Sequence, residues 1–150
     1  MNGESRVPIF GNKITGQNYI ERPGAYAIIQ DDHGRFATLR IGTALFLPGG
    51  GSLPGETPQA TLQREVMEEC GREIQIGREI GEAIEYLYAP KHGVYYYIQS
   101  TFFNAMFMDG EVLQHEEKHI FAWLSAIEAM QHFQRPSQVW AVQQFINNTD

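Results

Sequence analysis

Short apolar runs rich in β-branched and aromatic residues recur along the chain, and this pattern predicts strands. The predicted strands cover residues 25–30, 36–41, 43–47, 74–89, 94–106 and 120–124. The turn-forming residues 31–34 are expected to join the first two strands in a hairpin, and residues 91–93 to join the two longest in another. Because the segment after residue 47 is rich in glycine, the third strand is expected to run directly into a glycine loop.

A helical pattern replaces the strand pattern after Thr57 and ends at Gly71. Thr57 suits the N-cap, Pro58 suits the first helical position, and Gly71 is the kind of residue that commonly ends a helix. The apolar stripe of this helix consists of Leu62, Val66 and Cys70. We therefore expect the helix to dock on a core through this stripe and to leave its acidic residues at the edge.

The last third of the chain predicts two more helices, and the first part predicts little regular structure. Ser125 is expected to cap a brief helix over residues 126–130, and residues 136–147 are expected to form an amphipathic helix. Residues 1–22 show no clear period and are expected to be irregular. Strands around one early helix, with helices again at the end, predict an α/β (α+β) fold in which helices sandwich a mixed sheet. The 150 residues, 43% of them hydrophobic, suit a single domain over residues 1–150.

Composition narrows the classes of partner and compartment. The formal net charge is −7 and only 11 residues are Lys or Arg, which argues against a nucleic-acid polymer because that attraction needs clustered positive charge. No apolar stretch has the length of a membrane span and no secretory signal is evident, so no membrane partner is expected. Cys70 is the single cysteine, which excludes an intrachain disulfide and favours a reducing compartment, by default the cytoplasm. A homodimer is the default assembly.

Three carboxylates carry the first candidate chemistry. In a helix, Glu68 and Glu69 lie roughly 60° and 40° to either side of Glu65, so all three share one face. Acidic residues near an arginine such as Arg64 usually form only a solvated helix face. The glycine-rich loop at residues 47–56 changes this interpretation, because glycines let a backbone approach a ligand closely. Oxygen ligands of this kind favour Mg²⁺, with Mn²⁺ as a substitute, over metals that prefer nitrogen and sulfur ligands.

The spacing of Gly50, Glu56 and the run from Arg64 to Gly71 resembles the signature of the Nudix hydrolases. Arg72 departs from that signature, because the family normally has a bulky aliphatic residue there, and the next apolar side chain is Ile74. The resemblance implies the Nudix-type α/β/α sandwich with a central mixed sheet. It also implies metal-dependent cleavage of a pyrophosphate bond in a nucleoside diphosphate linked to another moiety. The substrate would be a nucleoside triphosphate, including an oxidised one, a dinucleoside polyphosphate or a nucleotide sugar.

The resemblance also implies roles for individual residues of the signature. Glu65 and Glu69 would be the principal metal ligands, and Glu68 a further ligand or the general base. Gly50 would offer its backbone carbonyl to the metal, and Arg64 would orient the glutamates through a salt bridge. These assignments make Glu65, Glu68 and Arg64 the catalytic candidates within the signature.

Residues outside the signature complete the candidate set. Members of the family often add an acidic residue from a later loop as ligand or base, and Glu116 and Glu117 both occupy a suitable place. Glu56 is expected to support the site structurally. Tyr88 stands near the spacing that is associated with dinucleoside polyphosphate hydrolases, which makes it a candidate for substrate binding. Cross-strand packing offers the plainer explanation, because Tyr88 is one of several tyrosines on the predicted hairpin.

Two alternative functions belong to other classes. One is a noncatalytic nucleotide-binding or regulatory module with the same fold. The other is a zinc hydrolase, because residues 115–119, His-Glu-Glu-Lys-His, match a pattern in which two histidines one helical turn apart bind Zn²⁺. That reading requires residues 115–119 to be helical and needs a third ligand from elsewhere.

Overall fold

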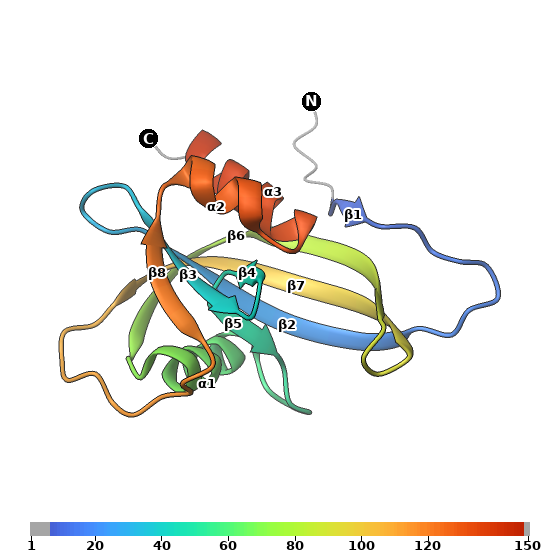
Figure 1. Cartoon of the computed structure of the whole chain (residues 1–150), viewed down its shortest axis with the longest axis horizontal. Coiled ribbons are helices and arrows are strands. Elements are labelled where there is room, and N and C mark those ends of the chain that lie inside the picture. The colour runs from blue at the N-terminus through green and yellow to red at the C-terminus, as the bar shows by residue number, and fades with distance from the viewer. Residues whose placement is uncertain (1–6, 149–150) are drawn as a thin grey trace.

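A computed structural model describes residues 7–148, which form two sheets and three helices (Figure 1). The elements in chain order are β1 (Ile9–Phe10), β2 (Ile20–Ile29), β3 (Phe36–Ile41), β4 (Ala44–Phe46), β5 (Gly49–Gly51), α1 (Pro58–Cys70), β6 (Ile74–Ala89), β7 (Val94–Phe107), β8 (Ile120–Leu124), α2 (Ala126–His132) and α3 (Pro136–Asn147). The helices lie on both sides of the large sheet, with α1 on one side and α2 and α3 on the other. The predicted sandwich of helices around a mixed sheet is confirmed.

The large sheet has the strand order β1-β6-β7-β2-β5 and mixes both pairing directions. Strands β6 and β7 form the long antiparallel hairpin that the sequence predicts, while β2 runs parallel to β7 over its whole length. The short strand β5 is antiparallel to β2 and places the three glycines at the edge of the sheet. A smaller antiparallel sheet has the order β4-β3-β8.

The hairpin predicted between residues 25–30 and 36–41 is wrong. The turn itself forms, since the Asp31 carboxylate accepts hydrogen bonds from the backbone amides of His33 and Arg35. After one bridge between Gln30 and Phe36, however, β3 leaves β2 and pairs with β4 and β8. The reason is that β7 occupies one edge of β2 along ten residues, and β5 occupies part of the other.

The N-terminal segment is more regular than the sequence predicts. Strand β2 begins at Ile20, and β1 pairs in parallel with β6 at Ile84 and Glu85. Between residues 7 and 22, the residues that belong to neither strand are irregular, as predicted. Residues 1–6 lie outside the described residues. The segment gains its order from pairing with distant strands, which no local period in the sequence reports.

Helix α1 has the bounds and caps that the sequence predicts. The Thr57 hydroxyl accepts a hydrogen bond from the Ala60 amide at 3.1 Å, and Gly71 adopts the left-handed conformation with φ of 67°. The apolar stripe Leu62, Val66 and Cys70 packs in one core cluster with Ala25, Ala27 and Phe103 of the large sheet. This docking fixes the opposite edge of α1 beside β5.

The helices at the end of the chain close the other face of the large sheet. Helix α2 continues to His132, two residues beyond the predicted end, and begins with a capping box between Ser125 and Glu128. Helix α3 has its predicted bounds, and its Val142 and Phe145 pack in a second core cluster with the sheet. Among residues 7–148, none of the helices has the length and apolar character that a membrane span requires. The single domain over residues 1–150 stays a prediction.

Candidate active site

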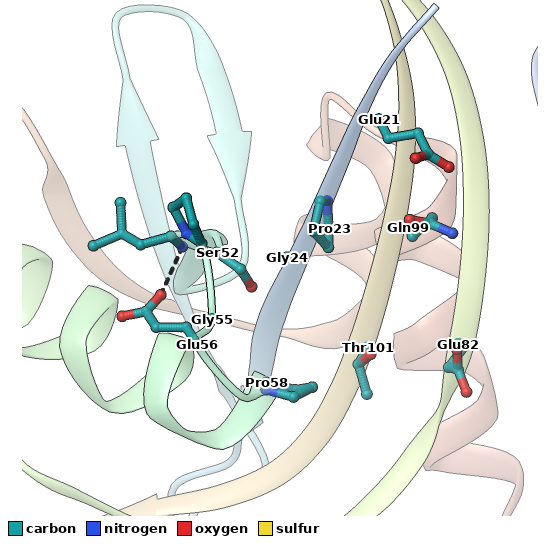
Figure 2. Close-up of a pocket in the computed structure, with 12 residues that line it drawn as sticks. Glu21, Pro23, Gly24, Ser52, Gly55, Glu56, Pro58, Glu82, Gln99 and Thr101 are labelled. Atoms are coloured by element: carbon teal, nitrogen blue, oxygen red, sulfur yellow. Dashed lines mark hydrogen bonds between the residues drawn. The ribbon is translucent and has the colours of Figure 1, made fainter.

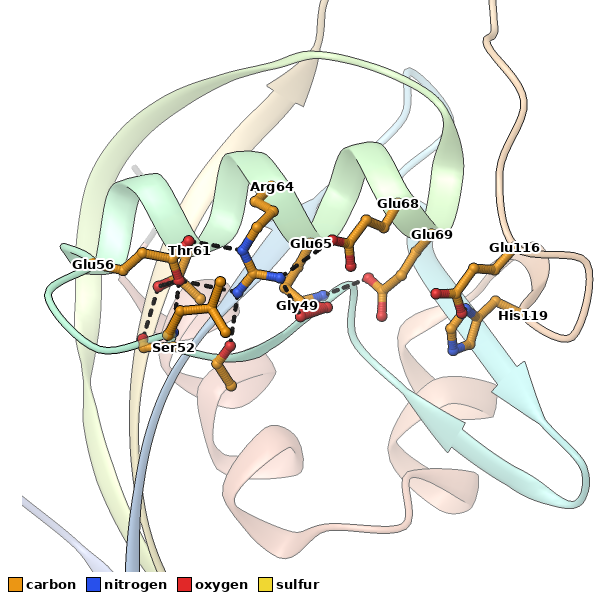
Figure 3. A network of polar contacts seen from close by, with 12 residues as sticks. Gly49, Ser52, Glu56, Thr61, Arg64, Glu65, Glu68, Glu69, Glu116 and His119 are labelled. Carbon is orange, nitrogen blue, oxygen red and sulfur yellow. Dashed lines mark hydrogen bonds and ion pairs between the residues drawn. The ribbon is translucent and has the colours of Figure 1, made fainter.

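The glycine strand β5 lies directly against the acidic edge of α1 (Figure 3). The Gly49 amide donates a hydrogen bond of 2.9 Å to the Glu69 carboxylate. Gly50 approaches the Glu65 carboxylate so closely that a Cβ atom at Gly50 would lie 2.6 Å from the Glu65 Cδ atom. Any side chain at Gly50 would therefore push Glu65 or β5 out of place. This contact explains why the chain needs glycine there.

Arg64 is the centre of the polar network in front of β5 (Figure 3). Its guanidinium binds both carboxylate oxygens of Glu56, at 2.7 and 3.0 Å, and donates to the Gly51 carbonyl at 2.9 Å. It also contacts the carboxylates of Glu65 at 3.0 Å and Glu68 at 3.4 Å. The loop before α1 and two of the helix glutamates are thus held by one side chain. The hydrogen bonds from Arg64 lower the pKa of Glu56 to about 2, so this carboxylate stays ionised across the physiological range.

Glu69 is the most buried member of the cluster, with 7% of its surface exposed. Burial raises its pKa to about 9, and the hydrogen bond from Gly49 only partly opposes that rise, while the nearby charges of Glu65, Glu116 and Glu68 add to it. Burial also raises the pKa of Glu65, although the hydrogen bond and the positive charge of Arg64 act to lower it. A carboxylate in these surroundings is strained when ionised unless a cation accompanies it.

The structure separates the two later acidic candidates. The Glu116 amide donates to the Glu68 carbonyl at 3.0 Å, and its carboxylate lies 3.0 Å from the His119 ring. Figure 3 shows Glu116 beside Glu69, in line with its effect on the pKa of that residue. Glu117 is exposed and makes no hydrogen bond or ion pair with the described residues. The fold therefore brings Glu116, and not Glu117, to the glutamates of α1.

The zinc interpretation of residues 115–119 is wrong, because this segment is a loop and a turn before β8. Its two histidines are not one helical turn apart on a helix face, as the pattern requires. His115 contacts the neighbouring Glu116 carbonyl, and His119 contacts the Glu116 carboxylate. Across residues 7–148, no three His, Cys, Asp or Glu side chains are grouped so as to hold a metal ion by themselves.

Tyr88 lies apart from the glutamates, near the tip of the β6–β7 hairpin. It pairs with Tyr95, and the centroids of the two rings are 4.6 Å apart. Strand β5 pairs with the part of β2 that in turn pairs with Ser100 to Phe102 of β7. These residues lie several positions farther along β7 than Tyr95. Aromatic packing accounts for Tyr88 in the structure, and its role in substrate binding stays a prediction.

A pocket of about 530 Å³ opens in front of the loop that precedes α1 (Figure 2). Strands β2, β6 and β7 form its floor, and the loop from Ser52 to Gly55 forms one wall. The carboxylates of Glu21, Glu56 and Glu82 line this pocket, and the Glu56 carboxylate forms an ion pair with Arg64. Such a lining repels an anionic ligand that brings no cation with it.

The loop between β7 and β8 is anchored to the end of α1, a contact that the sequence analysis did not predict. The Leu113 amide donates to the Gly71 carbonyl at 2.7 Å, and a Cβ atom on Gly71 would collide with the Leu113 carbonyl. Arg72 stacks 4.2 Å from the centroid of the Phe107 ring and reaches the Met108 carbonyl at 3.4 Å. The departure at Arg72 thus contributes to docking the loop, while Ile74 fills the core. An arginine where an aliphatic residue is expected was the only signal in the sequence.

A family model described as the NUDIX domain matches residues 21–145, which include strands β3 to β8 and the acidic helix α1. The chain therefore belongs to the Nudix family of hydrolases. No sequence among the curated proteins matches the chain closely enough to indicate a relative.

Solved structures of the same fold have little sequence in common with the chain. The MutT protein of Methanosarcina mazei Go1 has a TM-score of 0.71 at 21% identity, covering 90% of this chain and 100% of that chain. The dihydroneopterin triphosphate pyrophosphohydrolase of E. coli has a TM-score of 0.68 at 17% identity, with coverages of 85% and 96%. An Ap4A hydrolase of C. elegans has a TM-score of 0.64 at 16% identity, also with coverages of 85% and 96%. At these identities the likeness shows the fold alone.

Proposed function

We propose that the protein is a Mg²⁺-dependent hydrolase of the pyrophosphate bond in a nucleoside diphosphate linked to another moiety. The buried carboxylate of Glu69 carries this proposal, because it lies between a backbone amide and further carboxylates, where its ionised form is disfavoured unless a cation accompanies it. The hard oxygen donors at this edge fit Mg²⁺ or Mn²⁺ better than Zn²⁺. The solved neighbours named for a triphosphate and for Ap4A are consistent with substrates of this class.

Glu65, Glu69 and the Gly50 carbonyl would hold the ion, with Glu116 and Glu68 completing the acidic surroundings. Magnesium usually takes only one or two carboxylates and fills its remaining positions with water and substrate phosphates, so the chain need not supply a full cage. When bound, the ion would neutralise the phosphate oxygens and activate a water.

The residues of the chain would then position groups and move a proton. Arg64 would hold Glu65 and Glu68 in place and stay positively charged, because its ion pairs raise its pKa further. Glu68 is the more exposed of these two glutamates, with 46% of its side chain exposed against 18% for Glu65. Glu68 is therefore our candidate for accepting the proton of the attacking water, with Glu116 as the alternative.

A substrate panel tests the proposal. The full chain with Mg²⁺ is incubated with nucleoside triphosphates, dinucleoside polyphosphates and nucleotide sugars, and the products are identified by mass. We expect cleavage between phosphates, and Glu69→Gln should reduce kcat/KM by about 100-fold or more because it removes a charged ligand. Glu73→Gln, an exposed position after the helix, serves as the control and should leave the rate unchanged.

Turnover of Glu69→Gln at a near-normal rate would contradict the assignment of the metal site. Stabilisation by nucleotides without any turnover across the panel would instead support a noncatalytic module. The cytoplasm as compartment and a homodimer as assembly stay expectations.

A further inference from the structure

Helix α1 covers only part of its face of the large sheet. It packs on the sheet through the core cluster that contains Ala25 and Phe103, and it begins at Pro58. The long strands β2, β6 and β7 continue past this end of the helix toward the tip of the β6–β7 hairpin (Figure 1). The pocket of about 530 Å³ in Figure 2 opens on the uncovered part, and the proposed metal chemistry does not use it.

The floor of this pocket carries polar side chains that face the open space. Thr101 stands two residues before Phe103 and shares its face of the sheet, Glu82 pairs directly with Thr101, and Gln99 lies two residues farther back. All three line the pocket (Figure 2). Their side chains form no hydrogen bond or ion pair with residues 7–148. The floor therefore offers a free carboxylate, a free amide and a free hydroxyl to a ligand.

The two unpaired carboxylates of the pocket do not converge on one point. Glu21 of β2 stands opposite Tyr97, whereas Glu82 of β6 stands opposite Thr101, four residues farther along β7. Four residues of a strand span roughly 13 Å. A bound cation needs oxygens that converge, so this lining does not suit one. It suits an uncharged ligand with several hydroxyl groups, which donate to carboxylates and exchange hydrogen bonds with amides and hydroxyls.

The wall of the pocket is held in place by the chain itself. The Ser52 amide donates to the Pro23 carbonyl at 2.8 Å, and the Ser52 hydroxyl accepts a hydrogen bond of 2.7 Å from Thr61 of α1. The next residue, Leu53, donates its amide to Glu56 at 2.8 Å. The loop is thus tied to both the sheet and the helix, and the pocket is largely formed before a ligand enters.

The pocket adjoins the candidate active site on the same face of the sheet. A Cβ atom on Gly50 would point at Glu65, and Gly50 pairs with Ala25, which packs under α1. Arg64 contacts the Glu65 carboxylate at 3.0 Å and the Glu56 carboxylate, which lines the pocket, at 2.7 Å. One guanidinium therefore separates the two. The group next to a phosphate held at Glu65 can reach the pocket.

There is room for a further group beyond the pocket. A second cavity of about 570 Å³ shares Glu21 with the pocket and is lined by Tyr86 and Tyr97. These two tyrosines pair across the hairpin, with ring centroids 5.2 Å apart. From Thr101 to Tyr97 the floor runs for four residues, a length comparable to that of a nucleoside.

We propose that the pocket binds the ribose of the substrate and that the Glu82 carboxylate accepts hydrogen bonds from its 2′- and 3′-hydroxyls. The inference rests on the proposed function and deepens it, because it makes the preferred substrate a ribonucleotide. A ribose is joined to its phosphate through one methylene group and carries no charge, so the acidic lining does not repel it. A carboxylate is a common partner of the ribose 2′-hydroxyl in nucleotide-binding proteins. Gln99 and Thr101 bind the remaining ring oxygens, and the base points toward Tyr97.

The test compares each ribonucleoside triphosphate with its own 2′-deoxy counterpart, so that preference among bases cancels. With the full chain and Mg²⁺ we expect kcat/KM to be about 10-fold higher for the ribonucleotide, and most of the difference should lie in KM. Glu82→Ala should bring this ratio close to one and leave hydrolysis of the deoxynucleotide nearly unchanged. Glu79→Ala makes the same change at an exposed position of β6 outside the pocket and should keep the ratio.

Nucleosides without phosphate probe the pocket independently of metal and turnover. The ¹⁵N-labelled, metal-free protein is titrated with adenosine, guanosine, cytidine and uridine, and the amide signals of Gln99 and Thr101 are followed. We expect these signals to shift, with a Kd about 10-fold weaker for the 2′-deoxynucleosides and for Glu82→Ala. The Glu79→Ala variant should bind as the unmodified protein does.

The two arms separate this inference from the proposed activity. Ribose-dependent shifts without turnover of any substrate would support the pocket and defeat the proposed hydrolysis. Equal turnover of ribo- and deoxynucleotides, a Glu82→Ala variant that keeps the ratio, or no shift at Gln99 and Thr101 with any ribonucleoside would each overturn the ribose site. Stronger binding of a cationic compound such as choline than of the nucleosides would overturn it as well.

Discussion

At the scale of single residues, the site places its carboxylates in opposite environments. Glu56, bound by Arg64, has its pKa lowered to about 2, whereas burial raises the pKa of Glu69 to about 9. The first is a permanent anion that fixes the loop before α1. The second holds a proton readily until a cation replaces it, which couples metal binding to proton release.

Glu69 makes the stability of the metal-free protein depend on pH. Its folded pKa of about 9 lies above the ordinary value of 4.5, so the folded state binds this proton more tightly than the unfolded state. Its contribution is therefore most favourable below pH 4.5 and declines as the pH rises from 4.5 towards 9. Glu69→Gln removes the need to take up a proton on folding and should stabilise the protein at pH 8 by about 1–3 kcal/mol.

Urea unfolding in the presence of EDTA at pH 5 and pH 8 measures this effect. The advantage of Glu69→Gln over the unmodified protein should shrink at pH 5, and saturating Mg²⁺ should reverse it at pH 8. A variant that is less stable than the parent at pH 8 without metal would show that Glu69 is not buried as a strained carboxylate.

At the scale of elements, helix α1 organises the site through its middle and its C-terminal end. Its middle residue, Arg64, holds the loop before the helix. Its C-terminal end receives the loop between β7 and β8 through hydrogen bonds to the carbonyls of Glu68 and Gly71. The position of Glu116 beside Glu69 thus depends on how firmly this loop is docked.

Arg72 should act as a positioning residue for that loop. Arg72→Ala removes the contact with Phe107 and the hydrogen bond to Met108, so Glu116 should lose part of its placement. We expect apparent Mg²⁺ affinity in the hydrolysis assay to weaken by about 10-fold, with kcat at saturating Mg²⁺ less affected. Arg78→Ala, at an exposed position on β6, is the matched control.

A double variant shows whether Arg72 acts through Glu116. If it does, Arg72→Ala should add little to the defect of Glu116→Gln. Additive losses of Mg²⁺ affinity would contradict the positioning role, and a Glu116→Gln variant with normal affinity would remove Glu116 from the site itself.

At the scale of the whole molecule, α3 joins the two sheets. Gln138 is buried to 1% exposure, and its side-chain oxygen accepts a hydrogen bond of 2.7 Å from the Leu47 amide. Leu47 lies between β4 of the small sheet and β5 of the large one. This bond fixes the point where the chain passes from one sheet to the other, just before the glycines of the site.

Replacing Gln138 by Leu should destabilise the protein by about 1–3 kcal/mol, because the buried Leu47 amide loses its acceptor. Urea unfolding measures the change, and the slope with denaturant should stay the same. Gln143→Leu, at an exposed position on α3, should cost less than about 0.5 kcal/mol. Equal effects of the two variants would mean that the Leu47 amide is satisfied in another way.

The sequence by itself determined the features that depend on neighbours along the chain. Thr57, Pro58 and Gly71 define α1 because capping and left-handed backbone are local properties, and the spacing of the glutamates follows from the period of the helix. The β6–β7 hairpin was equally local. The family signature could be read for the same reason, since all its members lie within one loop and one helix.

Only the tertiary structure decided how distant segments meet. It sent β3 into the small sheet instead of a hairpin with β2, and it chose Glu116 over Glu117 by bonding the loop to the end of α1. It also set Glu85 and Arg22 on one face, two strands apart, and neither forms an ion pair with the described residues. Strand pairing and burial depend on contacts between residues far apart in the chain, so no local sequence pattern predicts them.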